Sequence, residues 1–179
     1  MCSRARLIVQ QARDAVRSLL SASLACWTIK RALEHIECPV TVYAFDDETE
    51  IAYTKANKAE RTQYKFIYGS GGTDPYEALI LAEKSLLSSQ RKNKMMFIIT
   101  DGIFHSHRND DVIARIAKRG ILTTMVLIMR DKEYADISTR KEYNLDHGAE
   151  IFRRVNSGKD LLSLAKDVVV GAIKKKQRT

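Results

Sequence analysis

The chain has 179 residues, of which 45% are hydrophobic and 29% are charged, and it contains two prolines. This length fits a single domain over residues 1–179, and this composition excludes disordered and fibrous proteins. No apolar run approaches the ~20 residues that span a bilayer, and no signal sequence is evident, so we expect a cytoplasmic protein without a membrane partner.

The formal net charge of +8 favours nucleic acid, anionic membrane or acidic protein as a partner without choosing among them. Part of the excess lies in a basic tail over residues 174–179, which is weak support for nucleic acid because basic residues also suit a frayed helix end. The three cysteines, Cys2, Cys26 and Cys38, form no Cys-x-x-Cys pair, so we expect reduced thiols, two of them buried.

The first predicted element is one long helix over residues 4–36. Apolar residues recur there at alternating spacings of four and three, as one face of a helix requires. They are Ile8, Ala12, Ala15, Leu19, Ala22, Cys26, Ile29, Leu33 and Ile36. An unbroken helix of this length would reach roughly 50 Å, so it either projects from the domain or bends near residues 21–23.

Strands and helices alternate along the rest of the chain. β-Branched, aromatic and apolar runs predict strands, and periodic segments bounded by caps or by glycine predict helices. The predicted strands are 40–45, 50–54, 64–68, 95–100, 121–129 and 150–155, and the predicted helices run from Thr73 or Asp74 to about 89, over 110–118 before Gly120, and over 157–175, with a short helix or loop at 131–140.

This alternation predicts an α/β fold, a Rossmann-like, doubly wound, mostly parallel sheet with helices on both faces. Ligands of such sheets bind outside the carboxyl ends of the strands, where the strand order reverses. Two loops are therefore of interest: residues 69–74, which are rich in glycine, and residues 101–107, which follow a buried strand.

Thr73 and Asp101, one in each of these loops, are the candidate metal ligands. A hydroxyl and a carboxylate are hard oxygen donors of the kind that a magnesium-like ion takes. Each residue alone has a plainer interpretation, Thr73 as a helix cap and Asp101 as a turn residue.

His105 and His107 form a His-x-His pair that could bind a transition metal on a strand. We predict instead a solvated loop in which Asp110 or Asp111 caps the next helix. No phosphate-binding loop, serine nucleophile elbow or zinc-protease motif occurs, and we expect no catalytic residues and no enzymatic activity.

Two motifs together resemble the von Willebrand factor type A family, in its soluble microbial form: Gly71-Gly72-Thr73-Asp74 opening a helix, and Phe97-Ile98-Ile99-Thr100-Asp101-Gly102. The likeness extends over nearly the whole chain. It implies a metal-ion-dependent adhesion site made of an Asp-x-Ser-x-Ser loop, a threonine and an aspartate, which a partner's carboxylate often completes. By this resemblance Thr73 and Asp101 match the second and third elements and would hold Mg²⁺ or Mn²⁺.

The first element of that site is absent, because no Asp-x-Ser-x-Ser precedes the predicted long helix. Met1 resembles the methionine that follows this loop in the family, so we expect the first, central strand to be missing. Three explanations stay open: Met1 is an internal methionine of a longer chain, a partner or second copy supplies the strand, or the sheet closes without it. An open sheet edge would favour oligomerisation.

The function that these residues and the resemblance imply is protein–protein interaction through a partial or degenerate metal site, with an acidic residue from the partner. The family resemblance implies an AAA+ ATPase as such a partner. The alternatives are a basic nucleic-acid-binding domain, which salt dependence would reveal, and a structural subunit of a larger viral or ribonucleoprotein assembly without metal, which size in solution would reveal.

Overall fold

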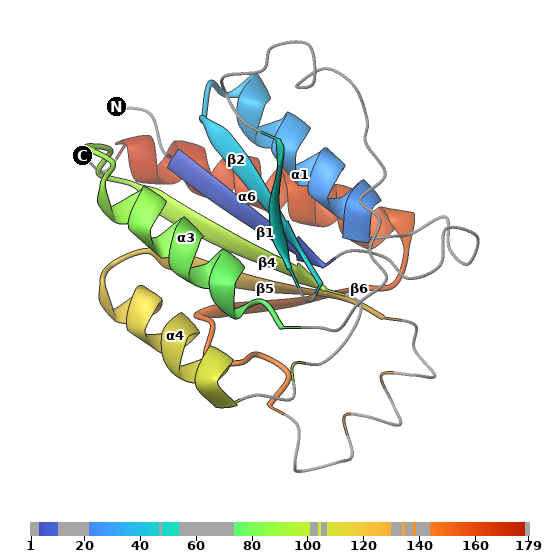
Figure 1. Cartoon of the computed structure of the whole chain (residues 1–179). Coiled ribbons are helices and arrows are strands. Elements are labelled where there is room, and N and C mark those ends of the chain that lie inside the picture. The colour runs from blue at the N-terminus through green and yellow to red at the C-terminus, as the bar shows by residue number, and fades with distance from the viewer. Residues whose placement is uncertain are drawn as a thin grey trace.

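The structure, a computed structural model, describes residues 4–10, 22–46, 48–53, 74–100, 104, 107–129, 134, 138 and 144–177. A six-stranded sheet in the order β3-β2-β1-β4-β5-β6 forms the middle layer, with α1 and α6 on one face and α3 and α4 on the other (Figure 1). The predicted doubly wound α/β fold is confirmed. In chain order the elements are β1 (Arg4–Gln10), α1 (Ala22–His35), β2 (Val40–Phe45), β3 (Thr49–Tyr53), α3 (Tyr76–Leu87), β4 (Lys94–Thr100), α4 (His107–Lys118), β5 (Leu122–Ile128), β6 (Ile151–Val155) and α6 (Gly158–Gln177).

β1 is the central strand that the sequence interpretation had expected to be missing. It lies between β2 and β4 and runs parallel to both, with Ile8 opposite Tyr43 on one side and Ile98 on the other. The expectation of a missing strand was therefore wrong, and so was the helix over residues 4–36, because the helix α1 begins only at Ala22. Met1 precedes this strand, so it does not correspond to the methionine after the family's first loop.

Both faces of β1 are covered, which explains why the strand is buried throughout its middle. Leu7 and Val9 pack in the core beneath α1 and α6, and Ile8 packs in the core beneath α3 and α4. All three side chains are fully buried. A strand inside a parallel sheet needs apolar residues on both faces, and the run Leu7-Ile8-Val9 supplies them.

Arg6 is the exception in this strand, since a charged side chain lies in the sheet's interior. Its Nε and Nη2 donate hydrogen bonds to Ser85 Oγ of α3 at 3.1 and 2.7 Å, and its Nη1 donates to the carbonyl of Ala5 at 2.8 Å. Burial, reinforced by the charge of Arg4, lowers the pKa of Arg6 to about 10. Hydrogen bonds to neutral oxygens thus satisfy the guanidinium, which no carboxylate of the described residues neutralises.

A second polar group joins the two helices on that face. Glu83 of α3 is buried and accepts hydrogen bonds from Arg115 Nη2 at 2.8 Å and from Arg119 Nη1 at 3.0 Å, both at the C-terminal end of α4. The hydrogen bond to Glu83 raises the pKa of Arg115. The two arginines keep about half of their surface in solvent, so this network fixes the spacing of α3 and α4 more than it adds stability.

The other predicted elements are confirmed with small shifts at their ends, except for two segments. The strand expected at 64–68 lies outside the described residues, as does most of 131–140. α4 begins at His107, so this residue lies on the helix and not on the predicted loop, while His105 lies outside the described residues. Gly120 ends α4 with a φ of 76°, a conformation that glycine adopts without strain.

None of the described helices is long and apolar enough to cross a membrane. This finding includes α6, whose exposed face carries Lys159, Lys166 and Asp167 between its buried leucines.

The buried thiols give a direct test of the core. Cys26 and Cys38 are buried and form no disulfide within the described part of the chain, and burial raises the pKa of Cys26 to about 12. Because only the thiolate attacks alkylating agents, iodoacetamide at about pH 8 should leave Cys26 unmodified in the folded chain and modify it in guanidinium chloride. Mass spectrometry of tryptic peptides measures both states. Equal rates of alkylation with and without denaturant would contradict the packing of α1 against the sheet.

Candidate functional site

The strand order reverses between β1 and β4, and this places the candidate site at the carboxyl ends of the parallel strands, here called the carboxyl edge. After β1 the chain crosses to β2 on one side, whereas β4, β5 and β6 follow on the other. The strands end there at Gln10, Phe45, Thr100 and Ile128. A crevice at such a reversal is where doubly wound sheets bind ligands, as the sequence interpretation had expected.

Thr73 and Asp101, the two predicted ligands, lie outside the described residues. Their neighbours in the sequence are described: Asp74 comes just before α3, and Thr100 is the buried last residue of β4. Thr73 therefore lies next in sequence to the start of α3, and Asp101 lies next to the end of β4, both at the carboxyl edge.

Asp74 connects the first turns of α3 and α4. Its Oδ2 accepts a hydrogen bond from Arg108 Nη2 at 2.6 Å, and its Oδ1 accepts from Asn109 Nδ2 at 3.2 Å and from the amide of Tyr76 at 3.1 Å. The carboxylate thus accepts the amide of the first residue of α3, but the predicted cap at Asp74 is not confirmed, because the N-cap of α3 is Pro75. The carboxylate also forms an ion pair with Arg108, so it is a poor substitute ligand for a metal ion.

Arg108 is held in place from two sides at this edge. Its guanidinium carbon lies 3.8 Å from the ring centroid of Tyr76, and its ion pair with Asp74 fixes the other side. The arginine side chain is 54% exposed. A guanidinium that is stacked on an aromatic ring and paired on one side can still present its remaining donors to a carboxylate.

Asn109 adds an acceptor whose hydrogen-bonding capacity is unused. Its side chain is buried, with 1% of its surface exposed, and its Nδ2 is spent on Asp74. Its Oδ1 is buried and accepts no hydrogen bond. A buried acceptor without a hydrogen bond costs free energy. A hydrogen-bond donor supplied by a ligand would therefore be stabilised at the start of α4.

The turn after β2 is hydrogen-bonded to the backbone of Asp74. The carbonyl of Asp46 accepts the amide of Asp74 at 3.3 Å, and Asp46 Oδ1 accepts the amide of Glu48 at 2.9 Å. The backbone just after Thr73 is therefore tied to the end of β2.

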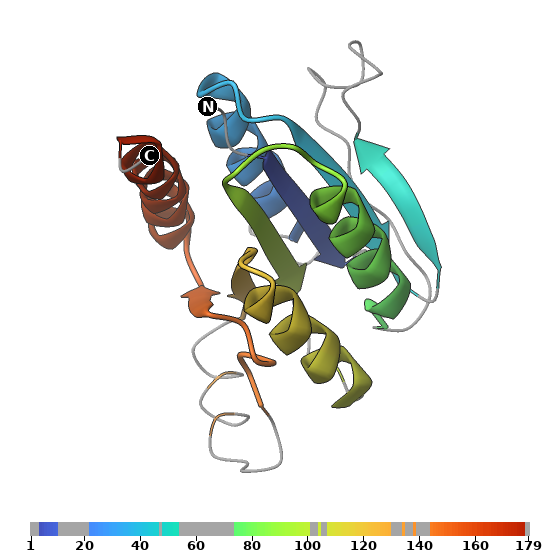
Figure 2. The same cartoon turned by 90° about the vertical axis from the view of Figure 1, so that its left-hand side faces the viewer.

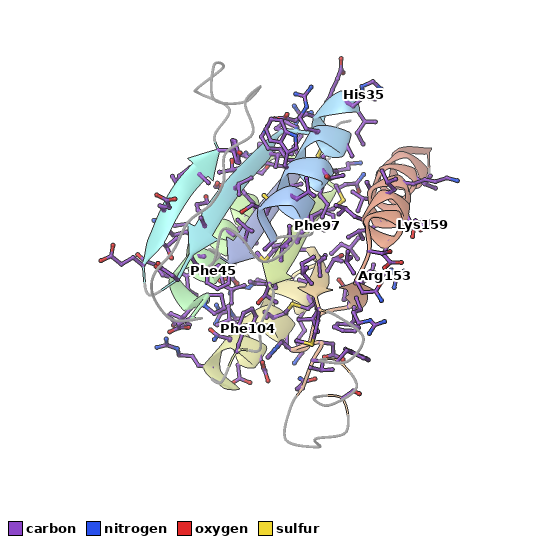
Figure 3. All side chains as sticks on the ribbon, turned by 90° about the vertical axis from the view of Figure 1, so that its right-hand side faces the viewer. His35, Phe45, Phe97, Phe104, Arg153 and Lys159 are labelled. Carbon is purple, nitrogen blue, oxygen red and sulfur yellow. The ribbon has the colours of Figure 1, made fainter. Side chains whose placement is uncertain are left out.

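An aromatic and histidine cluster closes the other side of this edge. Phe104 packs against Phe45, at a centroid distance of 6.0 Å (Figure 3). On its other side it packs against His147, at 4.7 Å. His147 is buried, has a φ of 49°, and lies with its Nδ1 2.7 Å from Asp110 Oδ1. Nothing in the local sequence indicates that His147 contacts Asp110, 37 residues away.

The described residues do not by themselves make up a metal-ion-dependent adhesion site. No group of three or more His, Cys, Asp or Glu side chains in the described ranges is placed to hold a metal ion. Now that β1 is located, the segment after it reads Gln10-Gln11-Ala12-Arg13-Asp14, where the resemblance implies Asp-x-Ser-x-Ser. The carboxylate and serine ligands expected there are absent, although the strand that would carry them is present.

Comparison with known proteins identifies the fold. No family model matches the sequence, and no curated protein is significantly similar to it. Among solved structures, the chain is similar to the conserved hypothetical protein BatB from Bacteroides thetaiotaomicron, with 16% identity, a TM-score of 0.67, and coverage of 99% of this chain and 98% of that one.

Two other similar structures hold metal ions. Proximal thread matrix protein 1 from the mussel byssus, with a zinc-occupied MIDAS motif, has 13% identity and a TM-score of 0.66 over 96% of this chain and 46% of its own. The manganese-loaded TRAP protein of Plasmodium vivax has 13% identity and a TM-score of 0.66 over 94% and 73%. These likenesses and the sheet order agree with the two sequence motifs: the chain has the fold of a von Willebrand factor type A domain.

Proposed function

We propose that this chain is a protein-interaction domain without enzymatic activity, and that it binds an acidic segment of a partner protein at the carboxyl edge. The observation that carries the proposal is Arg108, which is half exposed and is held rigidly by Asp74 and Tyr76 at the edge where this fold binds ligands. A preorganised arginine loses little conformational entropy when it pairs with a carboxylate.

A divalent cation, Mg²⁺ or Mn²⁺, at Thr73 and Asp101 is the second part of the proposal. Two oxygen donors leave most of an octahedral shell to water, so we expect weak binding by the chain alone and tighter binding when a partner's carboxylate joins the shell. The metal-loaded states of the mussel and Plasmodium proteins make this cation a reasonable candidate. An AAA+ ATPase as the partner remains a proposal drawn from the family resemblance.

Selection from a random peptide library tests the interaction, with the intact chain immobilised in the presence of Mn²⁺. We expect peptides rich in Asp and Glu to be enriched, and Arg108→Gln to reduce their affinity on the order of tenfold, the loss of one charge-assisted pair. Lys166→Gln, an exposed charge removed from α6, is the matched control. Enrichment without acidic residues, or equal affinity for both variants, would overturn the proposal.

The contribution of the metal is measured separately by calorimetric titration with Mg²⁺ and Mn²⁺. Thr73→Ala and Asp101→Ala should abolish whatever heat of binding the unmodified chain shows, and should reduce acidic-peptide affinity only in the presence of metal. Equal peptide affinity with Mn²⁺ and with a chelator would contradict the role of the cation in partner binding. It would not affect the role proposed for Arg108.

A further inference from the structure

A second charged surface lies at the opposite end of the sheet, where the parallel strands begin, here called the amino edge. Figure 2 views the molecule from this side, with the start of β1, the connection between α3 and β4, and the end of α6 around one face. Basic residues gather on these segments: Arg4, Lys84, Arg91, Lys92, Lys94, Lys118 and Arg119, with Lys174, Lys175 and Lys176 in the last turns of α6.

Five of these cations are not neutralised by the described residues. In the part of the chain that the structure describes, Arg4, Arg91, Lys92, Lys94 and Lys118 make no ion pair, whereas Arg119 is paired with Glu83. Arg4 Nε is buried and has no hydrogen-bond acceptor. The side chains of Arg91, Lys92 and Lys118 are exposed.

Acidic residues do not balance this edge. Glu37, just after α1, and Glu150, just before β6, lie there among the described residues. Glu150 Oε2 already accepts the amide of Thr123 at 3.2 Å. The favourable interaction of cations with the C-terminal ends of helices explains the position of Lys118. It does not explain the basic residues at the starts of strands and in the α3–β4 connection, such as Arg4 and Arg91.

We propose that the amino edge binds nucleic acid through its phosphate backbone. The described cations are spread over the starts of β1 and β4, the α3–β4 connection and the end of α4, so they form an extended surface and not a pocket for one anion. Gln90 and Asn93 lie among them as neutral hydrogen-bond donors of the kind found in phosphate contacts.

The same observations distinguish nucleic acid from other polyanions. The large exposed apolar side chains of the described residues are Ile51, Leu81, Leu87, Leu162 and Val170, and only Leu87 adjoins the α3–β4 connection. A membrane-binding surface would combine basic residues with several apolar or aromatic side chains that enter the bilayer. No tyrosine or tryptophan among the described residues is exposed. We therefore expect binding without base stacking and without sequence preference.

The test compares two double variants that remove the same charge from different faces. Arg91→Gln with Lys92→Gln changes the amino edge, and Arg153→Gln with Lys159→Gln changes β6 and the start of α6 (Figure 3). All four side chains are exposed, so both variants should fold. Fluorescence anisotropy with a labelled DNA duplex is measured over a range of salt concentrations.

For the amino-edge variant we expect affinity to fall on the order of tenfold, and the slope of log K against log salt to become shallower by about 1.8, the loss of two phosphate contacts. The β6–α6 variant should change neither quantity appreciably. Asp101→Ala, which tests the carboxyl edge, should bind DNA normally, so failure here is separable from failure of the proposed function.

Three results would overturn the inference. The first is no DNA binding at low salt, and the second is an equal loss in both double variants. The third is a preference of the intact chain for phosphatidylserine vesicles or polyglutamate over DNA at matched charge, since either would assign the amino edge to a membrane or to an acidic protein.

Discussion

Replacing Ile8 by alanine is expected to lower the free energy of unfolding by about 2–5 kcal/mol. Ile8 lies in the central strand, is fully buried, and packs beneath α3 and α4 with Ile98 and Leu79 in the same core. The neighbouring strands are paired on both sides and cannot move inward to fill the cavity. Urea denaturation followed by circular dichroism measures the change.

Leu162→Ala is the matched control for this prediction, because Leu162 has 69% of its surface exposed on α6. Its effect should stay within about 0.5 kcal/mol. If residues 4–36 instead formed a projecting helix, Ile8 would contribute little to the core and the two variants would behave alike. That result would refute the central position of β1.

Restoring the missing ligands after β1 should raise the affinity for Mn²⁺ on the order of a hundredfold, since ligand number and charge set the affinity of such oxygen sites. The change is Gln10→Asp, Ala12→Ser and Asp14→Ser, which writes Asp-x-Ser-x-Ser from the last residue of β1. Gln10 lies opposite Phe45, which is followed by Asp46 at the carboxyl edge, so the new aspartate would start at the level of that edge.

Calorimetric titration with Mn²⁺ measures this gain. The same triple change combined with Asp101→Ala is the control, and it should lose most of the gain because the restored loop and Asp101 would hold one ion together. A triple variant that folds but binds Mn²⁺ no better than the unmodified chain would show that more than the first loop separates this chain from the metal-binding domains.

Strands made of uninterrupted apolar and β-branched residues were predicted correctly from the sequence. β1 was predicted as a helix, and this error has a physical reason. Val40–Phe45 and the run ending at Thr100 carry uninterrupted apolar and β-branched residues. In β1 this signal is interrupted by Arg6, which is tolerated in the interior because Ser85 accepts its hydrogen bonds. Ile8 also continues the helical spacing of Ala12 and Ala15, and no glycine or proline marks the end of the strand.

The candidate site was only partly predictable. Alternating strands and helices indicate which edge of the sheet receives a ligand, so the position of the site followed from the order of the elements. The contacts that shape it did not follow, because Asp74 meets Arg108 and Asn109 across 34 and 35 residues. Such pairs depend on how α3 and α4 pack, which no local pattern encodes.

The placement of the described chain ends determines how the molecule would be oriented on a support or within a fusion. β1 starts at Arg4 and α6 ends at Gln177 on the same side of the sheet (Figure 1). Any polypeptide or immobilisation tag joined to β1 or α6 therefore starts from that side, whereas Arg108, in the first turn of α4, lies at the opposite edge of the sheet. A sensor surface coupled through either end should accordingly leave the binding of acidic peptides unobstructed, and it should restrict access to the basic residues around Arg91.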